Sequence, residues 1–292
     1  MDMTFQQREL LPSDEDVEFY SQHGYYVSKK IFTEDEIDEA VYGSERFYAG
    51  ERDFSLPATV KAFEGWKPGD DDVIRINDYV SLQNAEILSL VMNPLIGAIA
   101  ARLSGSRKIR LWHDQMIFKP VDMSGAKTGI GWHTDRAYWK TCSSASMLTA
   151  WIPFQTCDES MGPLMVIDQS NNWKGNGELR YFHTKDQAGL RDQLATGGRE
   201  VSKVPLTLEK GQVSFHHCLT IHGSGPNRNA IPRHSLSIHM QDDSNRYRVY
   251  RHANGELATH RNDILCRVSE GQPDYTDPDF CPVLPSAEEA SE

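Results

Sequence analysis

Short strand-like runs of apolar and polar residues dominate the chain from Ile109 onward, and one further run alternates over 73–79. Alternation with a period of two puts successive side chains on opposite faces of a β-strand. Clusters of glycine, asparagine and proline separate the runs, as is usual between the strands of a β-sandwich or small barrel. The expected strands span residues 73–79, 109–119, 130–135, 147–154, 163–168, 203–208, 212–216 and 233–240.

Helical patterns lie in the first third of the chain, where capping residues open amphipathic stretches. The expected elements are a helix from the cap Ser13 to Gly24, a strand from Tyr25 to Phe32, a helix opened by the capping box of Thr33 and Glu36, and a helix over 87–103 that Pro94 interrupts. We interpret these helices as scaffold that packs on a sheet.

No internal repeat or linker is visible, so residues 1–292 are expected to form one domain. Its N-terminal part, 13–104, is largely helical, and its β core spans 109–241. The acidic residues 285–292 are expected to be a disordered tail.

Charge and composition exclude several classes of partner. The 292 residues carry a formal net charge of -12, which argues against binding to nucleic acid or to anionic membranes. No run of eighteen apolar residues is present, so no membrane span is expected, and no secretory or peroxisomal address is recognised. The cysteines are odd in number and form no C-x-x-C pair, which is typical of reduced thiols in the cytoplasm. They are Cys142, Cys157, Cys218, Cys266 and Cys281.

His133 and Asp135 suggest a metal site. On a strand, residues two apart project from the same face, so the two side chains would form two corners of a metal site. His222 is the best candidate for the third corner. Two histidines and one carboxylate with an open opposite face are typical of non-haem Fe(II) oxygenases. His-x-Asp alone is a weak signal, so the case depends on the surrounding sequence.

Other histidines compete for the third position. His216, His217 and His239 also lie in the C-terminal half of the β core. The Gly-Ser-Gly-Pro-Asn sequence after His222 favours this residue, because a turn there can bring its imidazole over the mouth of a barrel. We interpret His216 and His217 as structural or as neighbours of the ligands.

Taken together, several motifs in this sequence resemble those of the phytanoyl-CoA dioxygenase family, within the Fe(II)/2-oxoglutarate oxygenases. They occur in the family's order over roughly residues 15–245. The matching pieces are Phe19-Tyr20-x-x-x-Gly24-Tyr25-x-Val27, Gln115-x-x-x-Lys119-Pro120, Trp132-His133-Thr134-Asp135-x-x-Tyr138-Trp139, Trp151-Ile152-Pro153, Gly162-Pro163-Leu164-x-Val166-Ile167, and His222-Gly223-Ser224-Gly225-Pro226-Asn227 followed by Arg233.

The resemblance implies a mainly β fold, a double-stranded β-helix (jelly-roll, cupin-like) core with N-terminal helices on one sheet. It also implies that His133, Asp135 and His222 bind Fe(II) and that Arg233 grips the distal carboxylate of 2-oxoglutarate. The planar fork of arginine suits that contact better than lysine.

Further 2-oxoglutarate contacts are expected from residues near these motifs. They are Ser235, on the strand face of Arg233, then Trp151 and Thr149 on one strand, and Gln115 and Arg75 near the keto-acid end. Lys119 is interpreted as structural. Tyr138 and Trp139 are either core aromatics or part of the substrate pocket.

The resemblance therefore implies an Fe(II)- and 2-oxoglutarate-dependent dioxygenase that uses O2 to hydroxylate, or otherwise oxidise a C–H bond of, a small molecule. A role in secondary metabolism is expected, because no peroxisomal address accompanies the motifs. The loops over 50–72 and 169–202 are candidates for the substrate lining. Two alternatives stay open: a metal enzyme that uses no 2-oxoglutarate, and a non-catalytic ligand-binding member of the same fold.

Overall fold

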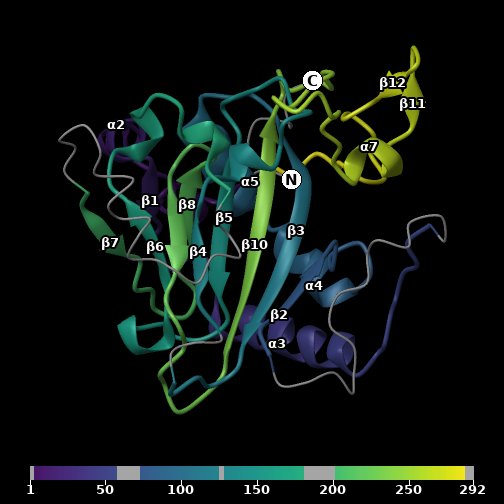
Figure 1. Ribbon diagram of the computed structural model, residues 1–292. Helices are drawn as coiled ribbons and strands as arrows, with labels where there is room; N and C mark the ends of the chain where they lie inside the picture. Colours follow the sequence, from purple (N-terminus) through teal and green to yellow (C-terminus); the bar gives the residue numbers. More distant parts are fainter. Residues whose placement is uncertain (1–2, 58–72, 125–127, 181–200, 287–292) are drawn as a thin grey trace.

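The computed structural model describes residues 3–57, 73–124, 128–180 and 201–286. Two antiparallel sheets lie against each other, and helices from the N-terminal part cover the outer face of the larger one (Figure 1). This is the β-helix core with N-terminal helices that the sequence predicted.

The larger sheet has six strands in the order β1-β8-β5-β10-β3-β2. They are β1 (Tyr25–Val27), β8 (Ser214–His217), β5 (Leu148–Pro153), β10 (Arg233–Asp242), β3 (Ile109–Lys119) and β2 (Arg75–Asp78). The smaller sheet has the order β4-β9-β6-β7. Its strands are β4 (Ile130–His133), β9 (His222–Ser224), β6 (Leu164–Ile167) and β7 (Lys203–Pro205).

The helices in the described residues are α1 (Phe5–Arg8), α2 (Asp14–His23), α3 (Glu34–Tyr48), α4 (Ala85–Val91), α5 (Pro94–Ser104) and α7 (Asn262–Leu265). The helices α2 and α3 begin at the caps found in the sequence, and Pro94 separates α4 from α5. Ser13 and Thr33 each cap a helix through a complete capping box, and Gly24 ends α2 in the left-handed conformation. Pro94 opens α5 at its first turn, where its missing N–H costs nothing.

The alternation along the central strands divides the larger sheet into two functional faces. On β10, Leu236 and Ile238 belong to the hydrophobic core, whereas Ser237 and His239 line a pocket on the opposite face. Where β3 pairs with β10, a register shift interrupts the alternation of side chains between the two faces along β3. It lies between the pairs His239–His113 and Met240–Leu111. Because of it, His113 faces the pocket and Leu111 faces the core.

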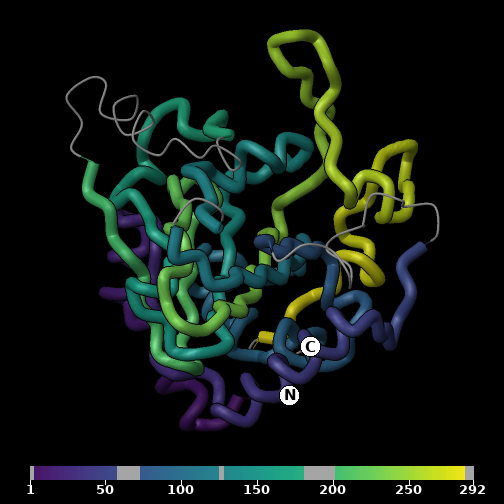
Figure 2. Tube along the Cα trace, turned by 60° about the horizontal axis from the view of Figure 1, so that its bottom comes forward, coloured from purple at the N-terminus to yellow at the C-terminus, as the bar shows by residue number. Residues whose placement is uncertain are grey.

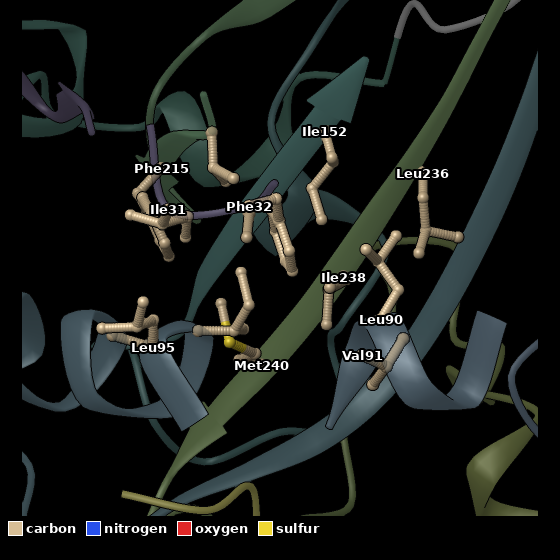
Figure 3. Close-up of a cluster of buried hydrophobic side chains, with 14 of the residues drawn as sticks. Ile31, Phe32, Leu90, Val91, Leu95, Ile152, Phe215, Leu236, Ile238 and Met240 are labelled. Carbon is tan, nitrogen blue, oxygen red and sulfur yellow. The ribbon is translucent and has the colours of Figure 1, made fainter. Parts of the chain in front are cut away.

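The core lies between the larger sheet and the helices. Figure 3 shows Leu90 of α4 and Leu95 of α5 close to strand residues such as Ile152, Ile238 and Met240, all of them buried. Burial of this surface holds the N-terminal helices on the sheet. The opposite face of the sheet is thereby left for chemistry.

One stretch is apolar enough, by length and composition, to span a membrane. It is Ala85–Ser104, with a mean hydropathy of 1.6 in an 18-residue window that is 56% buried inside the protein. In the structure, Asn93 and Pro94 divide this stretch into α4 and α5, and its apolar side chains belong to the core cluster. Core packing accounts for its composition.

Several predicted boundaries were wrong. The strand expected from Tyr25 to Phe32 stops at Val27, and the strand expected over 203–208 stops at Pro205. No expected element corresponded to α1, β9, α7 or the hairpin of β11 (Val268–Ser269) with β12 (Gln272–Pro273). Residues 58–72 and 181–200 of the expected loops, and 287–292 of the expected tail, lie outside the described residues.

The C-terminal segment, residues 243–286, packs along the edge of β3 (Figure 1). The backbone N–H of Leu111 donates to Pro282 O at 2.9 Å, and that of Leu284 donates to Ile109 O at 2.9 Å. In Figure 2 the yellow-green chain between β10 and α7 extends as a long loop before it returns to the body. The return brings residues 259–261 to the pocket.

The docking of this segment on α5 gives a stability test at Gly97. A methyl group there would overlap the backbone carbonyl of Pro285. Alanine normally stabilises a helix by about 1 kcal/mol relative to glycine, but the overlap should cost about 1–3 kcal/mol. We expect Gly97→Ala to lower the melting temperature.

The control is Ser89→Ala at an exposed position of α4, which should leave the melting temperature unchanged or slightly raised. Thermal unfolding followed by circular dichroism compares the two variants. A higher melting temperature for Gly97→Ala would mean that the C-terminal segment does not press on α5.

Candidate active site

Three buried side chains converge at one end of the smaller sheet. The imidazole nitrogens of His133 and His222 and a carboxylate oxygen of Asp135 all lie within 4.8 Å of one another. In the described part of the chain, this is the one group of three such residues close enough to share a metal ion. The structure thus brings together the three residues predicted from the sequence, and His216, His217 and His239 are not in the group.

The pairing of β4 with β9 sets the two histidines opposite each other. His133 and His222 are direct partners in the antiparallel ladder, with ring centroids 4.1 Å apart. The predicted strand geometry of Asp135 was wrong, however. β4 ends at His133, and Asp135 begins a 3-10 helix over Asp135–Ala137. A turn, rather than the period of a strand, brings its carboxylate beside the imidazoles.

Backbone carbonyls fix the tautomer of both histidines. His133 Nδ1 lies 2.8 Å from Gly131 O, and His222 Nδ1 lies 3.0 Å from Thr220 O. A carbonyl can only accept, so each Nδ1 carries the proton and each Nε2 keeps a lone pair. Burial, followed by His133 and His216, lowers the pKa of His222 well below its usual value. Both features favour the neutral, ligating form.

The Asp135 carboxylate is held in its ionised form. Burial by itself raises its pKa, but His222, His216 and His239 outweigh that effect and leave the pKa well below its usual value. Asp135 Oδ1 lies 3.5 Å from His222 Nε2, and Oδ2 lies 3.3 Å from His216 Nε2. His216 thus neighbours the three residues without joining them.

Thr149 orients this carboxylate. Its Oγ1 donates to Asp135 Oδ2 at 2.6 Å and lies 2.8 Å from His239 Nδ1. The sequence predicted a 2-oxoglutarate contact for Thr149 because it shares a strand face with Trp151. The structure instead ties its hydroxyl to Asp135, which leaves that hydroxyl no proton for a cosubstrate.

The three residues line a pocket of about 530 Å³ between the two sheets. Along β10, which runs the length of the pocket, Arg233 lines one end and His239 the other. The two residues are six positions apart, which corresponds to about 20 Å of extended strand. We call the first the arginine end and the second the histidine end.

The arginine end holds buried positive charge that the described residues do not neutralise. Arg233 is 1% exposed, its Nη1 donates to Gly162 O, and its Nε has no partner among the described residues. Burial lowers its pKa to about 10. Lys119 is also fully buried, and its Nζ donates to Ser224 Oγ at 2.7 Å and to Gly225 O at 2.6 Å. Burial and then Arg233 lower the pKa of Lys119.

Two buried cations with no acidic partner are costly unless an anion joins them. The arginine end therefore fits a carboxylate of an anionic ligand. Lys119 was interpreted as structural, and Ser224 was not singled out. Both face this end, because Ser224 lies two residues after His222 on β9 and Lys119 is the register partner of Arg233. Reading residues 222–224 as a strand would have revealed Ser224.

Trp151 and Ser235 both flank Arg233, with different outcomes. The Arg233 guanidinium lies 5.3 Å from the Trp151 ring centroid, and Trp151 lines the pocket. Ser235 lies on the predicted strand face, but it is fully buried and does not line the pocket. Its Oγ lies 3.5 Å from Ile117 O. The structure thus supports the predicted location of Trp151, whereas the predicted contact of Ser235 with 2-oxoglutarate stays a prediction.

Gln115 and Arg75 are separated by the alternation of their strands. Gln115 lines the pocket, where its Nε2 donates to Asp78 Oδ1 at 2.8 Å. Arg75 was wrongly placed at the keto-acid end. Its register partner is Phe118, and its guanidinium lies 4.1 Å from that ring's centroid, on the face covered by helices. Tyr138 and Trp139 do line the pocket, as one of the two interpretations expected.

Comparisons with known proteins agree with this geometry. A sequence model of the family described as phytanoyl-CoA dioxygenase (PhyH) matches residues 20–235. Peroxisomal phytanoyl-CoA dioxygenase of Rattus norvegicus is 28% identical over 244 residues, 78% of this chain and 68% of that protein. A probable alpha-ketoglutarate-dependent hypophosphite dioxygenase of Stutzerimonas stutzeri is 26% identical over 224 residues, 75% of each chain.

Solved structures share the fold at lower identity. The non-haem alpha-ketoglutarate-dependent carbocyclase SnoK from nogalamycin biosynthesis is 21% identical with a TM-score of 0.70, and the match covers 97% of this chain and 99% of SnoK. EctD from S. alaskensis with 2-oxoglutarate and 5-hydroxyectoine is 20% identical with a TM-score of 0.63, over 82% of this chain and 79% of EctD. These likenesses establish the architecture.

The contact between Thr149 and Asp135 can be tested through metal affinity. Thr149→Val keeps the shape of the side chain but removes the hydroxyl that orients the carboxylate. We expect metal affinity to fall about 10- to 100-fold, and Thr149→Ser to restore most of it. Calorimetric titration of the metal-free protein with Mn(II) measures both. Equal affinities in the valine and serine variants would contradict this role of the hydroxyl.

Proposed function

The chain belongs to the phytanoyl-CoA dioxygenase family, and we propose specific roles for its pocket residues in the chemistry of that family. It is a 2-oxoglutarate-dependent non-haem iron dioxygenase that acts on a small molecule. In our proposal, His133, Asp135 and His222 hold Fe(II), and Arg233 anchors 2-oxoglutarate with Lys119 and Ser224 beside it.

The observation that carries this proposal is the arrangement of the two features in one pocket. The three possible metal ligands and Arg233 line the same pocket of about 530 Å³, and Lys119 donates to Ser224 in the lining of that pocket. Two neutral imidazoles and one carboxylate form the donor set expected for Fe(II). Arg233, with its unpartnered Nε, fits a dicarboxylate held by its far end.

When bound, Fe(II) and 2-oxoglutarate supply the oxidising chemistry that consumes O2 and removes hydrogen from a substrate carbon. The chain contributes position and environment. Carbonyls of Gly131 and Thr220 hold the imidazoles, Thr149 holds the carboxylate, and Trp151 packs beside Arg233.

Secondary metabolism is the setting we favour for the substrate. The likeness to SnoK supports it, because that protein comes from nogalamycin biosynthesis. Location in the cytoplasm is also part of the proposal. It is supported by five cysteines that are all free and buried, although the relative from Rattus norvegicus is peroxisomal.

The ligand assignment predicts which histidine variant loses metal. His222→Ala removes one of three converging donors, so we expect loss of iron and of succinate formation while the protein stays folded. His216→Ala removes a neighbour and should retain most of the iron. Iron content after anaerobic reconstitution, with circular dichroism as a check of folding, distinguishes them. Iron retained by His222→Ala but lost by His216→Ala would reverse the assignment.

The role of Arg233 predicts a cosubstrate defect with metal binding intact. Loss of a buried charged contact costs about 2–5 kcal/mol, so Arg233→Ala should raise the concentration of 2-oxoglutarate required by about 30-fold to a few thousand-fold. Arg233→Lys should recover only part, because a point charge cannot replace the fork.

Arg75→Ala is the matched control, since Arg75 lies on the opposite face of the sheet. It should leave the 2-oxoglutarate dependence unchanged. The measurement is succinate formation against 2-oxoglutarate concentration, together with iron content. An unchanged requirement in Arg233→Ala would remove Arg233 from the site.

A further inference from the structure

Three imidazoles gather at the histidine end of the pocket. His113 comes from β3, His239 from β10, and His260 from the C-terminal segment just before α7. The ring centroid of His113 lies 4.3 Å from that of His239 and 5.3 Å from that of His260. All three line the pocket, and we call them the histidine trio. The proposed metal and cosubstrate sites use none of them.

The hydrogen bonds of His239 fix which of its nitrogens can accept. Thr149 has a single hydroxyl proton, and it donates this proton to the Asp135 carboxylate, which can only accept. The contact of 2.8 Å between Thr149 Oγ1 and His239 Nδ1 therefore requires Nδ1 to be the donor. A neutral His239 then keeps its lone pair on Nε2. This atom has no hydrogen-bond partner in the described part of the chain, so it presents an acceptor to the pocket.

His260 has the opposite polarity. The backbone N–H of Asn262 donates to His260 Nδ1 at 3.2 Å, so this nitrogen is an acceptor. A neutral His260 must therefore carry its proton on Nε2. The pocket wall thus offers a ligand an acceptor, His239 Nε2, and a donor, His260 Nε2–H, with His113 between them.

The histidine end lacks the excess positive charge of the arginine end. Burial, followed by His113 and Arg261, lowers the pKa of His260, which favours its neutral form. The nearest charged pair compensates itself, since Arg261 Nη1 donates to Asp78 Oδ2. An ionised ligand group would therefore find no counter-charge here.

We propose that the histidine trio binds a hydroxyl of the substrate, and that the enzyme selects uncharged, hydroxyl-bearing molecules. One hydroxyl, or two on neighbouring carbons, would donate to His239 Nε2 and accept from His260 Nε2–H. This inference rests on the proposed function and adds the substrate class to it. An aliphatic chain at the trio would leave buried polar nitrogens unpaired, which disfavours an alkyl substrate.

His239 also links the trio to the metal site. Its Nδ1 lies 3.8 Å from Asp135 Oδ2. Only the His239 imidazole would therefore separate a hydroxyl bound at Nε2 from the proposed metal ligand Asp135. The carbon skeleton of the substrate would then be held close to the proposed metal site. The histidine trio would thus determine which carbon of the substrate faces the proposed metal site.

The test uses the anaerobic Fe(II)-loaded enzyme with 2-oxoglutarate and four probes of similar size. They are cyclohexanol, trans-1,2-cyclohexanediol, methoxycyclohexane and cyclohexanecarboxylate. Protons of a probe bound near Fe(II) relax faster, so ligand-observed NMR reports binding at the metal. We expect the alcohols to show at least about tenfold stronger relaxation enhancement than the ether or the carboxylate, because the ether lacks a donor and the carboxylate lacks a counter-charge.

Variants assign the effect to the trio. His239→Phe and His260→Phe should each remove the preference for alcohols, whereas His252→Phe, outside the pocket lining, should keep it. Equal enhancement by cyclohexanol and methoxycyclohexane in the native enzyme overturns the inference, and this comparison needs no variant to fold. A preference for alcohols that persists in both His239→Phe and His260→Phe also overturns the inference.

Iron content and 2-oxoglutarate binding are measured on the same samples. They distinguish failure of the inference about the histidine trio from failure of the proposed function. If the native protein binds both but does not prefer alcohols, only the histidine trio loses its role. If it binds neither, the proposed function fails and the inference that rests on it fails as well.

Discussion

The register between β4 and β9 is the constraint on which the site depends. It sets His133 directly opposite His222, and the backbone carbonyls of Gly131 and Thr220 orient the two imidazoles. A shift by one residue would turn one imidazole to the other face of the sheet and leave Asp135 with a single partner. The N-terminal helices stabilise the larger sheet, and the smaller sheet, packed against that one, sets the geometry of the proposed ligands.

Charge is separated along the pocket in a way that assigns its two ends. Arg233 and Lys119 are buried at one end without an acidic partner among the described residues, while the other end combines the imidazoles of the trio with the ion pair of Asp78 and Arg261. A buried cation and a neutral imidazole favour different ligands. An anionic cosubstrate and an uncharged substrate can therefore enter one pocket without competing for the same end.

Sequence patterns predicted the elements and the converging residues better than they predicted local geometry. Helix caps and strand alternation are local signals, so Ser13, Thr33 and the strand over 109–119 were identified correctly. The turn at Asp135 and the face occupied by Arg75 depend on tertiary register, which no local pattern contains. The two-residue spacing of His133 and Asp135 correctly predicted that their side chains converge, although the assumed strand was wrong. A turn and a strand can both bring side chains two residues apart to one site.

The origin of the histidine trio explains why substrate identity is the hardest property to predict here. The family match spans residues 20–235 and so includes the proposed ligands and the arginine end. His239 and His260 lie beyond it, and His260 belongs to the C-terminal segment, which pairs with Ile109 and Leu111 of β3. In our proposal, residues within the family match hold the metal and the cosubstrate, while a segment outside the match completes the wall that meets the substrate. Within this fold, specificity can then change through the C-terminal segment without any change to the residues that carry the oxidation.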